Sequence, residues 1–533
     1  MTRSKLSALL IVNLFFAAHC FAENEFSFRI APGVEIPLGL PQFGPGIGAL
    51  ASFDWAFGKF AQKFNAGIGV EGAFASIPVQ TGPDANGNPL TLLGGRIGPF
   101  IRWRPHDRWA VRAAAGGGVY QYVRGDDSKA NLLAGFTAGA EFLLSPYFSL
   151  FADSAFTYRV FSSDPLNSIG LSLGLRLNLS EIMGGRARVK IEKTAQYNVF
   201  PVSWAWYEQN PVATIKVTNE EPNTITGVNL LFFTDSYMSQ PWTFASIDYL
   251  APGESAEVPV TALFNEAMLS LTENVNAHSV LQMQYQSLGA RKETSSSMQM
   301  PIFRRNTLSW DDDRRAAAFV SQRDSAAHLF ARYTAGAVEA AEGRQGRNMP
   351  PNVVYAAALF EALRLYGISY IIDPASSYIA LSEDEAALDN LNYPYETLKY
   401  RGGDCDDLSI LFCTVLEALS IESAFITIPG HIYTAFAIGD NNWLAGSSDI
   451  IVIDGKRWMP VEITVPGEGF TRAWRIGAQQ WKKAGNNAAL YPIRGCWTVY
   501  PPVTVPESGD SLPEMPEWND IVKAMESQLQ LVR

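Results

Sequence analysis

Three residues in the last third of the chain, Cys405, His431 and Glu462, are of the types that nucleophilic catalysis by a thiol requires. A cysteine attacks a carbonyl carbon once a histidine accepts its proton, and a carboxylate can orient the imidazole and stabilise its charged form. This chemistry needs the three side chains close together. The surrounding elements must therefore join residues that lie far apart in the sequence.

Cys405 stands at the start of a predicted helix. Apolar residues recur at helical spacing from Leu408 to Leu419, so one face of this helix is expected to be buried. Asp404 occupies the N-cap position, and Asp407 follows three residues later as in a shortened capping box. The helix dipole and the free N–H groups at this end favour a thiolate. Cys413, further along the helix, is predicted to be a small buried side chain.

His431 and Glu462 are predicted to lie on neighbouring strands. An alternating segment begins at His431, and after a turn at Asp454-Gly455 a second alternating segment runs from Arg457 to Thr464. Antiparallel pairing of these segments brings Glu462 to the histidine strand. Asp449 and Asp454 stay open as alternative acids, and Asp454 is the less favoured because it stands in a turn.

The only other histidine in this region is His328. It falls in an alanine-rich stretch with helical spacing, so it is expected to be a surface or packing residue.

This order of residues resembles the transglutaminase-like superfamily, which has a cysteine at a helix N-terminus, a histidine on a strand and an aspartate on the next strand. The match covers roughly Pro350 to Val499, and its most specific parts are Gly403 to Leu408, Gly430-His431 and Trp458 to Thr464. The resemblance implies that Cys405 is the nucleophile, His431 the general base and acid, and Glu462 the orienting acid. Glu462 departs from the family, which usually carries aspartate there.

The resemblance implies a thiol-dependent amide hydrolase, peptidase or acyl transferase that works through a thioester, acting on a protein or peptide in the periplasm. The superfamily also contains members without activity, so the alternative is an inert domain that serves as an outer-membrane scaffold or interaction protein. The backbone N–H of Cys405 is the expected oxyanion donor, and Tyr395 is a candidate for a second. No cofactor or metal is expected.

The first third of the chain, 24–182, is predicted to form an eight-stranded antiparallel β-barrel. Eight segments alternate between apolar and polar residues, most clearly from Ser168 to Leu179. Five charged residues stand on the polar face in mid-strand: Arg29, Glu71, Arg96, Glu141 and Asp153. A soluble barrel would put charge outside and bulky apolar residues inside, so this pattern favours the outer membrane.

The connections also alternate in length, as in an outer-membrane barrel. Long connections are expected around Pro41, Pro83 to Pro89 and Gly125 to Lys129, and tight turns at Arg104 to Asp107 and Ser145 to Tyr147. The short turns lie on the side of both termini, which places the rest of the chain in the periplasm.

The remaining segments complete a multidomain plan. Residues 1–22 have the basic start, apolar run and small-residue end of an export signal. Residues 185–304 are predicted to form an immunoglobulin-like β-sandwich that acts as a spacer. Residues 311–500 are expected to form the α+β, papain-like domain of the transglutaminase-like type, and 501–533 a C-terminal tail.

Composition excludes some classes of partner. The formal net charge of −12 argues against a polyanion-binding surface, so nucleic acid is not expected as a partner. Removal of the signal leaves three cysteines, Cys405, Cys413 and Cys496, so at least one thiol cannot pair within the chain.

Overall fold

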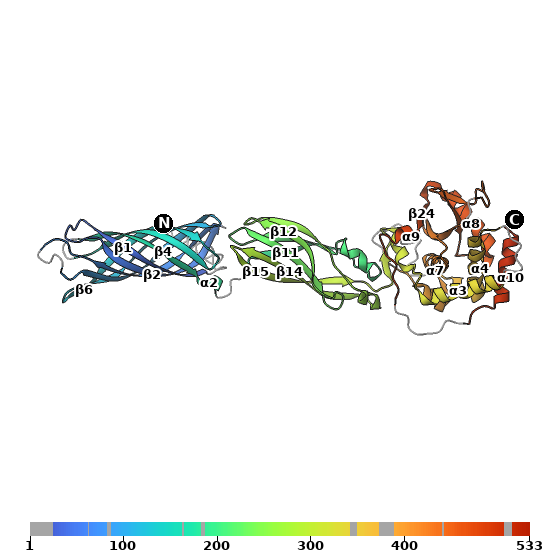
Figure 1. Cartoon of the computed structure of the whole chain (residues 1–533), viewed down its shortest axis with the longest axis horizontal. Helices are drawn as coiled ribbons and strands as arrows, with labels where there is room; N and C mark the ends of the chain where they lie inside the picture. The colour runs from blue at the N-terminus through green and yellow to red at the C-terminus, as the bar shows by residue number, and fades with distance from the viewer. Residues whose placement is uncertain are drawn as a thin grey trace, which may run out of the picture.

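The protein consists of three parts that follow one another in a row (Figure 1). The computed structural model describes residues 25–532 apart from 62, 83–86, 162–164, 183–186, 342–348, 373–387, 440–441 and 506–513. The export signal predicted over 1–22 lies outside the described residues. None of the helices described is long and apolar enough to cross a membrane.

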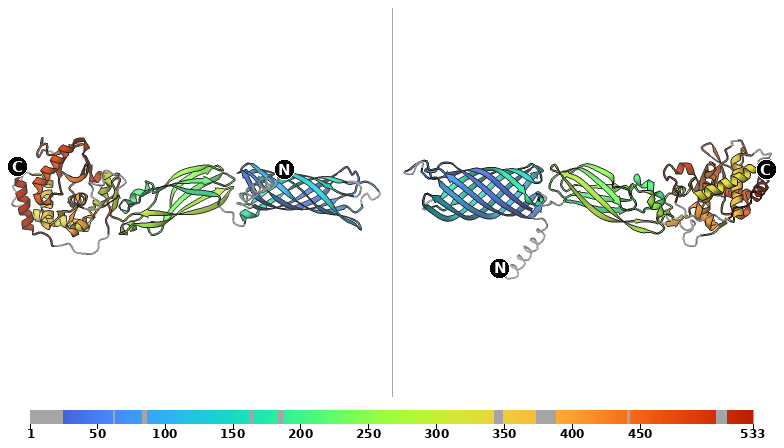
Figure 2. Two further views of the ribbon diagram at one scale, coloured as in Figure 1. Left: turned by 180° about the vertical axis from the view of Figure 1, so that it is seen from behind. Right: turned by 60° about the horizontal axis from the view of Figure 1, so that its bottom comes forward.

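The first part is a closed barrel of eight antiparallel strands, in which β1 pairs with both β2 and β8. Its strands are tilted against the barrel axis (Figure 2). They are β1 (Glu25–Leu38), β2 (Gly46–Ala61), β3 (Phe64–Ile77), β4 (Leu90–His106), β5 (Trp109–Arg124), β6 (Asp127–Leu143), β7 (Phe148–Arg159) and β8 (Leu166–Asn178). The short helix α2 (Leu179–Ile182) follows.

The two faces of the barrel have opposite character. Apolar side chains cover the outside, with Ile47 72% exposed and Leu173 65% exposed. The inside is charged: Arg29 and Glu141 are fully buried, and Arg29 pairs with Asp153 at 2.7 Å. This partition confirms the predicted one and matches a barrel whose outer surface faces hydrocarbon.

One predicted connection is wrong. The long loop expected from Gly125 to Lys129 is a tight hairpin, because β5 ends at Arg124 and β6 begins at Asp127. Gly125 has a φ of 58° and so supplies the left-handed conformation that this turn requires. Most of the loop expected from Pro83 to Pro89 lies outside the described residues.

The second part contains two antiparallel sheets that share one core. One sheet has the order β13-β10-β9 and the other β12-β11-β14-β15. Valine, leucine and isoleucine side chains from both sheets meet in this core, among them Ile215, Val217, Leu230 and Leu281. The immunoglobulin-like connectivity expected for 185–304 stays a prediction. The strands are β9 (Val189–Gln196), β10 (Ala213–Asn219), β11 (Ile225–Thr234), β12 (Trp242–Leu250), β13 (Ser255–Val260), β14 (Val275–Ser287) and β15 (Ala290–Ile302).

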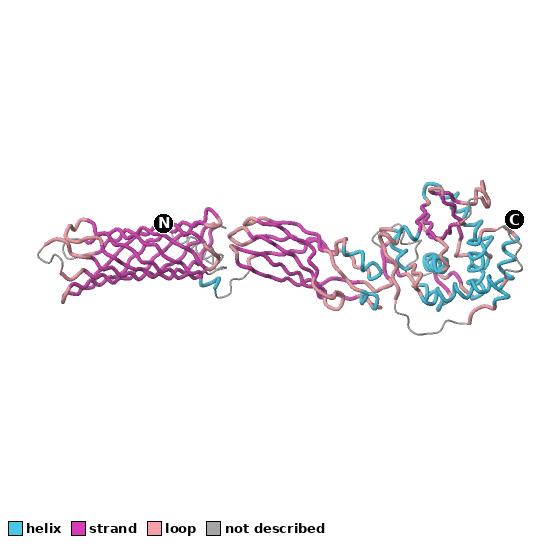
Figure 3. Tube along the Cα trace, viewed as in Figure 1, coloured by secondary structure: helices cyan, strands magenta, loops and turns pink. Residues whose placement is uncertain are grey.

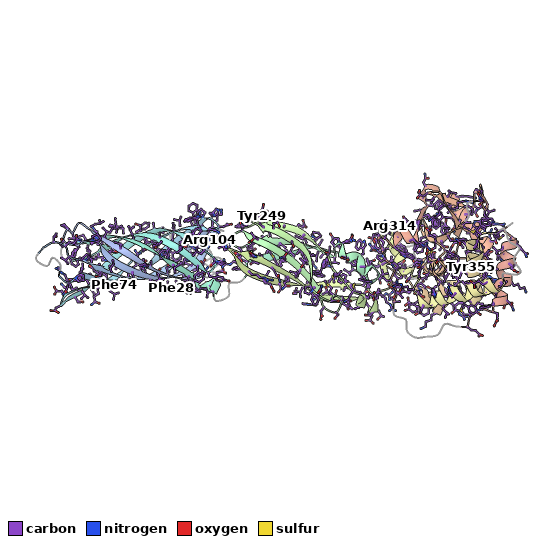
Figure 4. The ribbon with its side chains drawn as sticks, in the orientation of Figure 1. Phe28, Phe74, Arg104, Tyr249, Arg314 and Tyr355 are labelled. Atoms are coloured by element: carbon purple, nitrogen blue, oxygen red, sulfur yellow. The ribbon has the colours of Figure 1, made fainter. Side chains whose placement is uncertain are left out.

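Polar contacts join the barrel to the second part. Arg104 Nη1 donates to Asn223 Oδ1 at 3.0 Å, and the backbone N–H of Thr224 donates to Asp107 at 3.1 Å. Arg104 lies at the end of the barrel that faces the two-sheet domain (Figure 4). The second part therefore follows from the end of the barrel that carries the short turns and both barrel termini.

Helices are concentrated in the third part (Figure 3). Its main sheet has the order β22-β23-β21-β20-β24, and helix α7 packs against β20 and β21. The helices are η3 (Asp313–Phe319), α3 (Ser325–Ala340), α4 (Pro351–Tyr366), α6 (Pro394–Tyr400), α7 (Cys405–Ala418), η5 (Pro466–Glu468), α8 (Phe470–Ala484), η6 (Gly485–Asn487), α9 (Ile493–Cys496) and α10 (Trp518–Gln530). The strands are β16 (Thr307–Ser309), β17 (Ser369–Tyr370), β18 (Leu388–Asn390), β19 (Gly402–Gly403), β20 (Ser423–Ile428), β21 (His431–Ala437), β22 (Ile451–Ile453), β23 (Lys456–Val461) and β24 (Ala489–Pro492).

Helix α10 lies within the segment 501–533 that the sequence predicts as a tail, and this helix belongs to the domain instead. It packs on α4, and Ile521, Met525 and Leu529 are buried in the core beneath. Every third or fourth residue of α10 is apolar, which is the pattern of a packed helix.

A second core connects the two-sheet part to the third part. Two short 3-10 helices, η1 (Pro201–Glu208) and η2 (Glu266–Ser270), stand at this end of the two-sheet domain. Val202 and Leu269 from these helices lie in one apolar cluster with Cys405 and Ile410 of α7. Helix α7, which carries Cys405, therefore packs in a cluster formed by residues of both domains.

Candidate active site

Cys405 is the first residue of helix α7, as predicted. Asp404 has extended backbone angles and its side chain accepts a hydrogen bond from the N–H of Asp407, so it is the N-cap. The thiol is buried, and it lies beside the backbone of Ile432, the residue that follows His431 in β21. Packing of α7 on β21 thus brings the cysteine to the histidine strand.

The thiol is protonated at rest, whereas the helix position alone favours a thiolate. Burial, together with the charge of the Asp404 carboxylate, raises the pKa of Cys405 to about 12. Hydrogen bonds from the backbone of Ile432 and Asp406 oppose this rise and do not overcome it. Attack by the sulfur therefore needs a base that removes the proton during the reaction.

His431 and Glu462 are in direct contact. His431 begins β21, and Glu462 directly follows β23, which pairs antiparallel with β21. His431 Nε2 lies 2.7 Å from Glu462 Oε2. Because the carboxylate accepts the hydrogen on Nε2, the Nδ1 atom is the one left to receive a proton.

Glu462 is held rigidly in its charged form. Its other oxygen accepts hydrogen bonds from the backbone N–H of Thr464 at 3.1 Å and from the Thr464 hydroxyl at 2.6 Å. Burial raises the pKa of this carboxyl, but the hydrogen bond and charge of His431, with the bonds from Thr464, lower it below its ordinary value. Glutamate has a longer side chain than the aspartate usual in the superfamily, and at position 462 it reaches the imidazole of His431.

The two alternative acids are engaged elsewhere. Asp449 pairs with Lys482 Nζ at 2.5 Å, and both side chains are about 40% exposed. Asp454 occupies a turn with a φ of 51°, next to Gly455 at 74°. Of the three candidate acids, Glu462 is the one whose hydrogen bond to His431 is found.

Three carboxylates gather at the start of α7. Oxygens of Asp404, Asp406 and Asp407 all lie within 4.8 Å of one another, close enough to hold a cation. Burial, together with the charge of the neighbouring carboxylates, raises the pKa of Asp407 to about 7 and that of Asp406 well above its usual value. Asn392 donates two hydrogen bonds of 2.6 Å to Asp407, from its backbone and its side chain. The clustering of these three carboxylates was not predicted from the sequence.

The hydroxyl of Tyr395 is engaged by two neighbouring side chains. Its hydroxyl accepts a hydrogen bond from Arg305 at 2.9 Å and donates one to Glu396 at 3.0 Å. Another tyrosine, Tyr370, lies near the cysteine instead, because β17 pairs with β19 just before α7. Sequence reasoning missed it, since a strand of two residues carries no periodic signal.

The other predicted residues are placed as expected. Cys413 is fully buried, with its sulfur 3.8 Å from the backbone oxygen of Ala424. His328 lies exposed on helix α3.

Comparison with known proteins concerns the barrel. No family model matches the chain, and no curated protein matches it. Among solved structures, Neisserial surface protein A matches at 11% identity and a TM-score of 0.23, covering 28% of this chain and 96% of that one. The Yersinia pestis outer membrane protein Ail matches at 17% identity and a TM-score of 0.20, covering 29% of this chain and 100% of that one.

The N-terminal β-barrel domain of Pseudomonas aeruginosa OprF matches at 12% identity and a TM-score of 0.17, covering 29% of this chain and 100% of that one. The barrel itself is assigned from its closed strand pairing, its apolar outer face and its charged interior. On these features the chain is an outer-membrane β-barrel protein with an additional C-terminal region.

Proposed function

We propose that the C-terminal region is a thiol-dependent amide hydrolase or acyl transferase, held on the periplasmic face of the outer membrane by the barrel. The observation that carries the proposal is the 2.7 Å contact between His431 Nε2 and Glu462 Oε2, beside the helix that begins at Cys405. The order of cysteine, histidine and acid along the chain resembles that of the transglutaminase-like superfamily. The proposed substrates of this C-terminal region are proteins or peptides of the periplasm.

The reaction gives each of the three side chains a distinct role. His431 Nδ1 accepts the thiol proton while the sulfur of Cys405 attacks an amide carbonyl carbon, forming a C–S bond and an oxyanion. The C–N bond then breaks, and the imidazolium gives its proton to the leaving amine. Water then attacks the thioester carbonyl and gives a proton to His431, the C–S bond breaks to release an acid, and the imidazolium returns the proton to the Cys405 sulfur. An amine that attacks in place of water gives a new amide by the same steps. Glu462 keeps the imidazole oriented and stabilises its positive charge.

The orientation expected for the barrel in the membrane supports a periplasmic location of the candidate active site. In an outer-membrane barrel the short turns lie on the periplasmic side. The two-sheet domain contacts the barrel at Arg104 and Asp107, beside the short turn that joins β4 to β5. Because the three parts follow one another in a row (Figure 1), a barrel in this orientation would hold the C-terminal region on the periplasmic side of the membrane.

A product screen tests the activity. The full chain in detergent micelles is incubated with peptides of the cell envelope, with and without cadaverine as an amine acceptor. Mass spectrometry then detects hydrolysed or cadaverine-modified peptides, which we expect from the native chain and not from Cys405→Ala. If the two proteins give the same peptides, the chain is an outer-membrane scaffold rather than an enzyme.

Fractionation and proteolysis test the placement. The mature chain should stay with outer membranes through carbonate washing, and protease added to intact cells should spare the domain that contains Cys405. Loss of 311–533 from intact cells would show that the C-terminal region faces outward.

A further inference from the structure

A cavity lies at the junction of the two-sheet domain and the C-terminal domain. Its volume is about 600 Å³, within the range of about 300–1,000 Å³ that is usual for small-molecule sites. One wall comes from the 3-10 helices η1 and η2, and the other from 321–323 and 497–504. Helix α9, just before the second of these segments, lies on the side of its domain that faces the two-sheet domain (Figure 1). Cys405, His431 and Glu462 do not line this cavity, so it is distinct from the candidate active site.

The hydroxyl of Ser203, which lines the cavity, is buried without a hydrogen-bond partner. Ser203 is 3% exposed, and its Oγ atom bonds to no group among the described residues. The backbone holds this residue in place: its N–H donates to Phe200 O at 3.0 Å, and its φ of −103° and ψ of 25° interrupt η1. A buried hydroxyl without a partner is unfavourable, so a polar ligand group that enters the cavity gains a hydrogen bond there.

Two tryptophan rings, one from each domain, also line the cavity. Trp204 of η1 packs on the core of the two-sheet domain and on the cluster that joins the domains, and Trp497 packs on the same joining cluster. Trp497 Nε1 donates to the backbone oxygen of Ala317 at 3.1 Å, which fixes the orientation of that ring. Both side chains are half-buried, so part of each ring stays open. Aromatic rings in a cavity favour a ligand with a flat apolar side.

The two walls also carry charges of opposite sign. Glu266 of η2 and Arg323 are both exposed, and neither has an ion-pair partner in the part of the chain that the structure describes. Charges of both signs disfavour a polyanion, and charged groups beside an unpaired hydroxyl disfavour a purely apolar ligand. The lining residues belong to 3-10 helices and loops, so they offer no strand edge to an extended peptide.

A saccharide matches all of these features. A pyranose ring has an apolar C–H face that can stack on an indole, and the hydroxyls at its edge both donate and accept hydrogen bonds. We propose that the cavity binds a short stretch of cell-wall glycan, with sugar rings against Trp204 and Trp497 and sugar hydroxyls bonded to Ser203, Arg323 and Glu266. This glycan is the saccharide polymer of the periplasm, where the C-terminal region is proposed to lie. The inference does not rest on the proposed thiol chemistry.

Binding by the full chain in micelles tests the inference. The detergent is one without a sugar headgroup, because such a headgroup would compete for the cavity. The probes are soluble cell-wall glycan chains from which the peptides have been removed and, as the alternative ligand, a peptide of ten prolines, since aromatic-lined grooves also bind proline-rich segments. Saturation-transfer NMR detects binding, and titration gives the Kd. We expect the glycan to bind and the proline peptide not to bind.

Ser203→Ala separates a ligand-binding role from a structural one. The hydroxyl has no partner in the free chain, so its removal should leave the Tm unchanged or raise it, while glycan binding weakens by about 2–10-fold. Arg323→Gln should weaken binding by a similar factor, about 2–10-fold, at an unchanged Tm. Arg332→Gln is the matched control, because Arg332 is exposed on helix α3 and does not line the cavity. This variant should bind glycan as the native chain does.

The remaining outcomes contradict the proposal. Absence of glycan binding, or binding that Ser203→Ala and Arg323→Gln leave unchanged, overturns it. Binding of the proline peptide with the same losses in the two variants assigns the cavity to a proline-rich segment instead. A lower Tm in Ser203→Ala together with weaker binding overturns the role of the hydroxyl in favour of a structural one. None of these measurements uses the reactivity of Cys405, so each outcome leaves the proposed function to its own test.

Discussion

Both the barrel and the C-terminal domain bury charged side chains, but they balance them differently. Inside the barrel each buried carboxylate has an arginine partner, and these pairs are Arg29 with Asp153 at 2.7 Å, Arg102 with Glu141 at 2.7 Å, Arg112 with Asp54 at 2.8 Å and Arg176 with Glu25 at 2.5 Å. At the start of α7 three carboxylates cluster, and within the described residues no lysine or arginine pairs with them. The acid beside them, Glu462, pairs with a histidine.

The two regions differ in the type of residue that pairs with the buried carboxylates. Arginine is always charged, so the barrel pairs are fixed interactions that fill and close the interior. Histidine can take and give a proton near neutral pH, and clustered acids hold perturbed pKa values, both of which are typical of functional sites. Under the proposed function, buried charge has a structural role in the barrel and a reactive role in the C-terminal domain.

The largest effect is expected from Glu462→Gln. The amide keeps the shape of the side chain but loses the charge that orients His431, so turnover should fall by about 10⁴-fold while the fold is retained. Burst kinetics with p-nitrophenyl acetate and circular dichroism measure the two quantities.

Asp449→Asn and Asp454→Asn are the matched controls for this change. Asp449 pairs with Lys482 on the surface and Asp454 stands in a turn, so both variants should retain activity. An active Glu462→Gln protein beside an inactive Asp449→Asn protein would assign the acid to Asp449.

A smaller effect, on stability alone, is expected in the barrel. Arg29→Met removes one partner of a buried pair and should destabilise the barrel by about 3–5 kcal/mol, because Asp153 is left buried without its cation. The double variant Arg29→Met/Asp153→Leu should recover most of this loss. Urea unfolding in micelles measures both, and equal losses in the two variants would show that the pair is not the source of stability.

The carboxylate cluster predicts a weak pH dependence of the free energy of unfolding, with a sign opposite to that of acid denaturation. The folded pKa of Asp407, about 7, lies above its unfolded value of 3.8, and Asp406 is shifted in the same direction. The folded state therefore holds more protons in this window, so stability falls as pH rises from about 3.8 to about 7. Calorimetry of the C-terminal transition in EDTA should show this fall, and Asp407→Asn should flatten it. A midpoint that rises through the window would refute the shift.

Sequence patterns predicted the features that repeat and missed those that depend on single contacts. Eight alternating segments were enough to predict the barrel, because the period of a strand is set by its backbone. The N-cap at Asp404 and the pairing that brings Glu462 to His431 were also predictable, since they follow from local spacing and one hairpin.

The position of Tyr370 beside the start of helix α7 was not predictable, because it comes from long-range packing. Tyr395 is nearer to Cys405 in the sequence than Tyr370 is, yet its hydroxyl is bonded to Arg305. Tyr370 comes near only through the two-residue pairing with Gly403. Likewise, the segment of helix α10 was predicted to be a tail, because its packing on α4 is a long-range contact. In the sequence this contact is indicated only by a short apolar pattern.

The most direct test of the central claim compares the three cysteines of one protein. Cys405, Cys413 and Cys496 are equally buried, at 2%, 0% and 3% exposure, so access alone does not favour any of them. If His431 acts as base for Cys405, iodoacetamide at neutral pH should label Cys405 faster than the other two by about 10²-fold or more, and His431→Ala should abolish the difference. Equal slow labelling of all three thiols, unchanged in His431→Ala, would contradict the account.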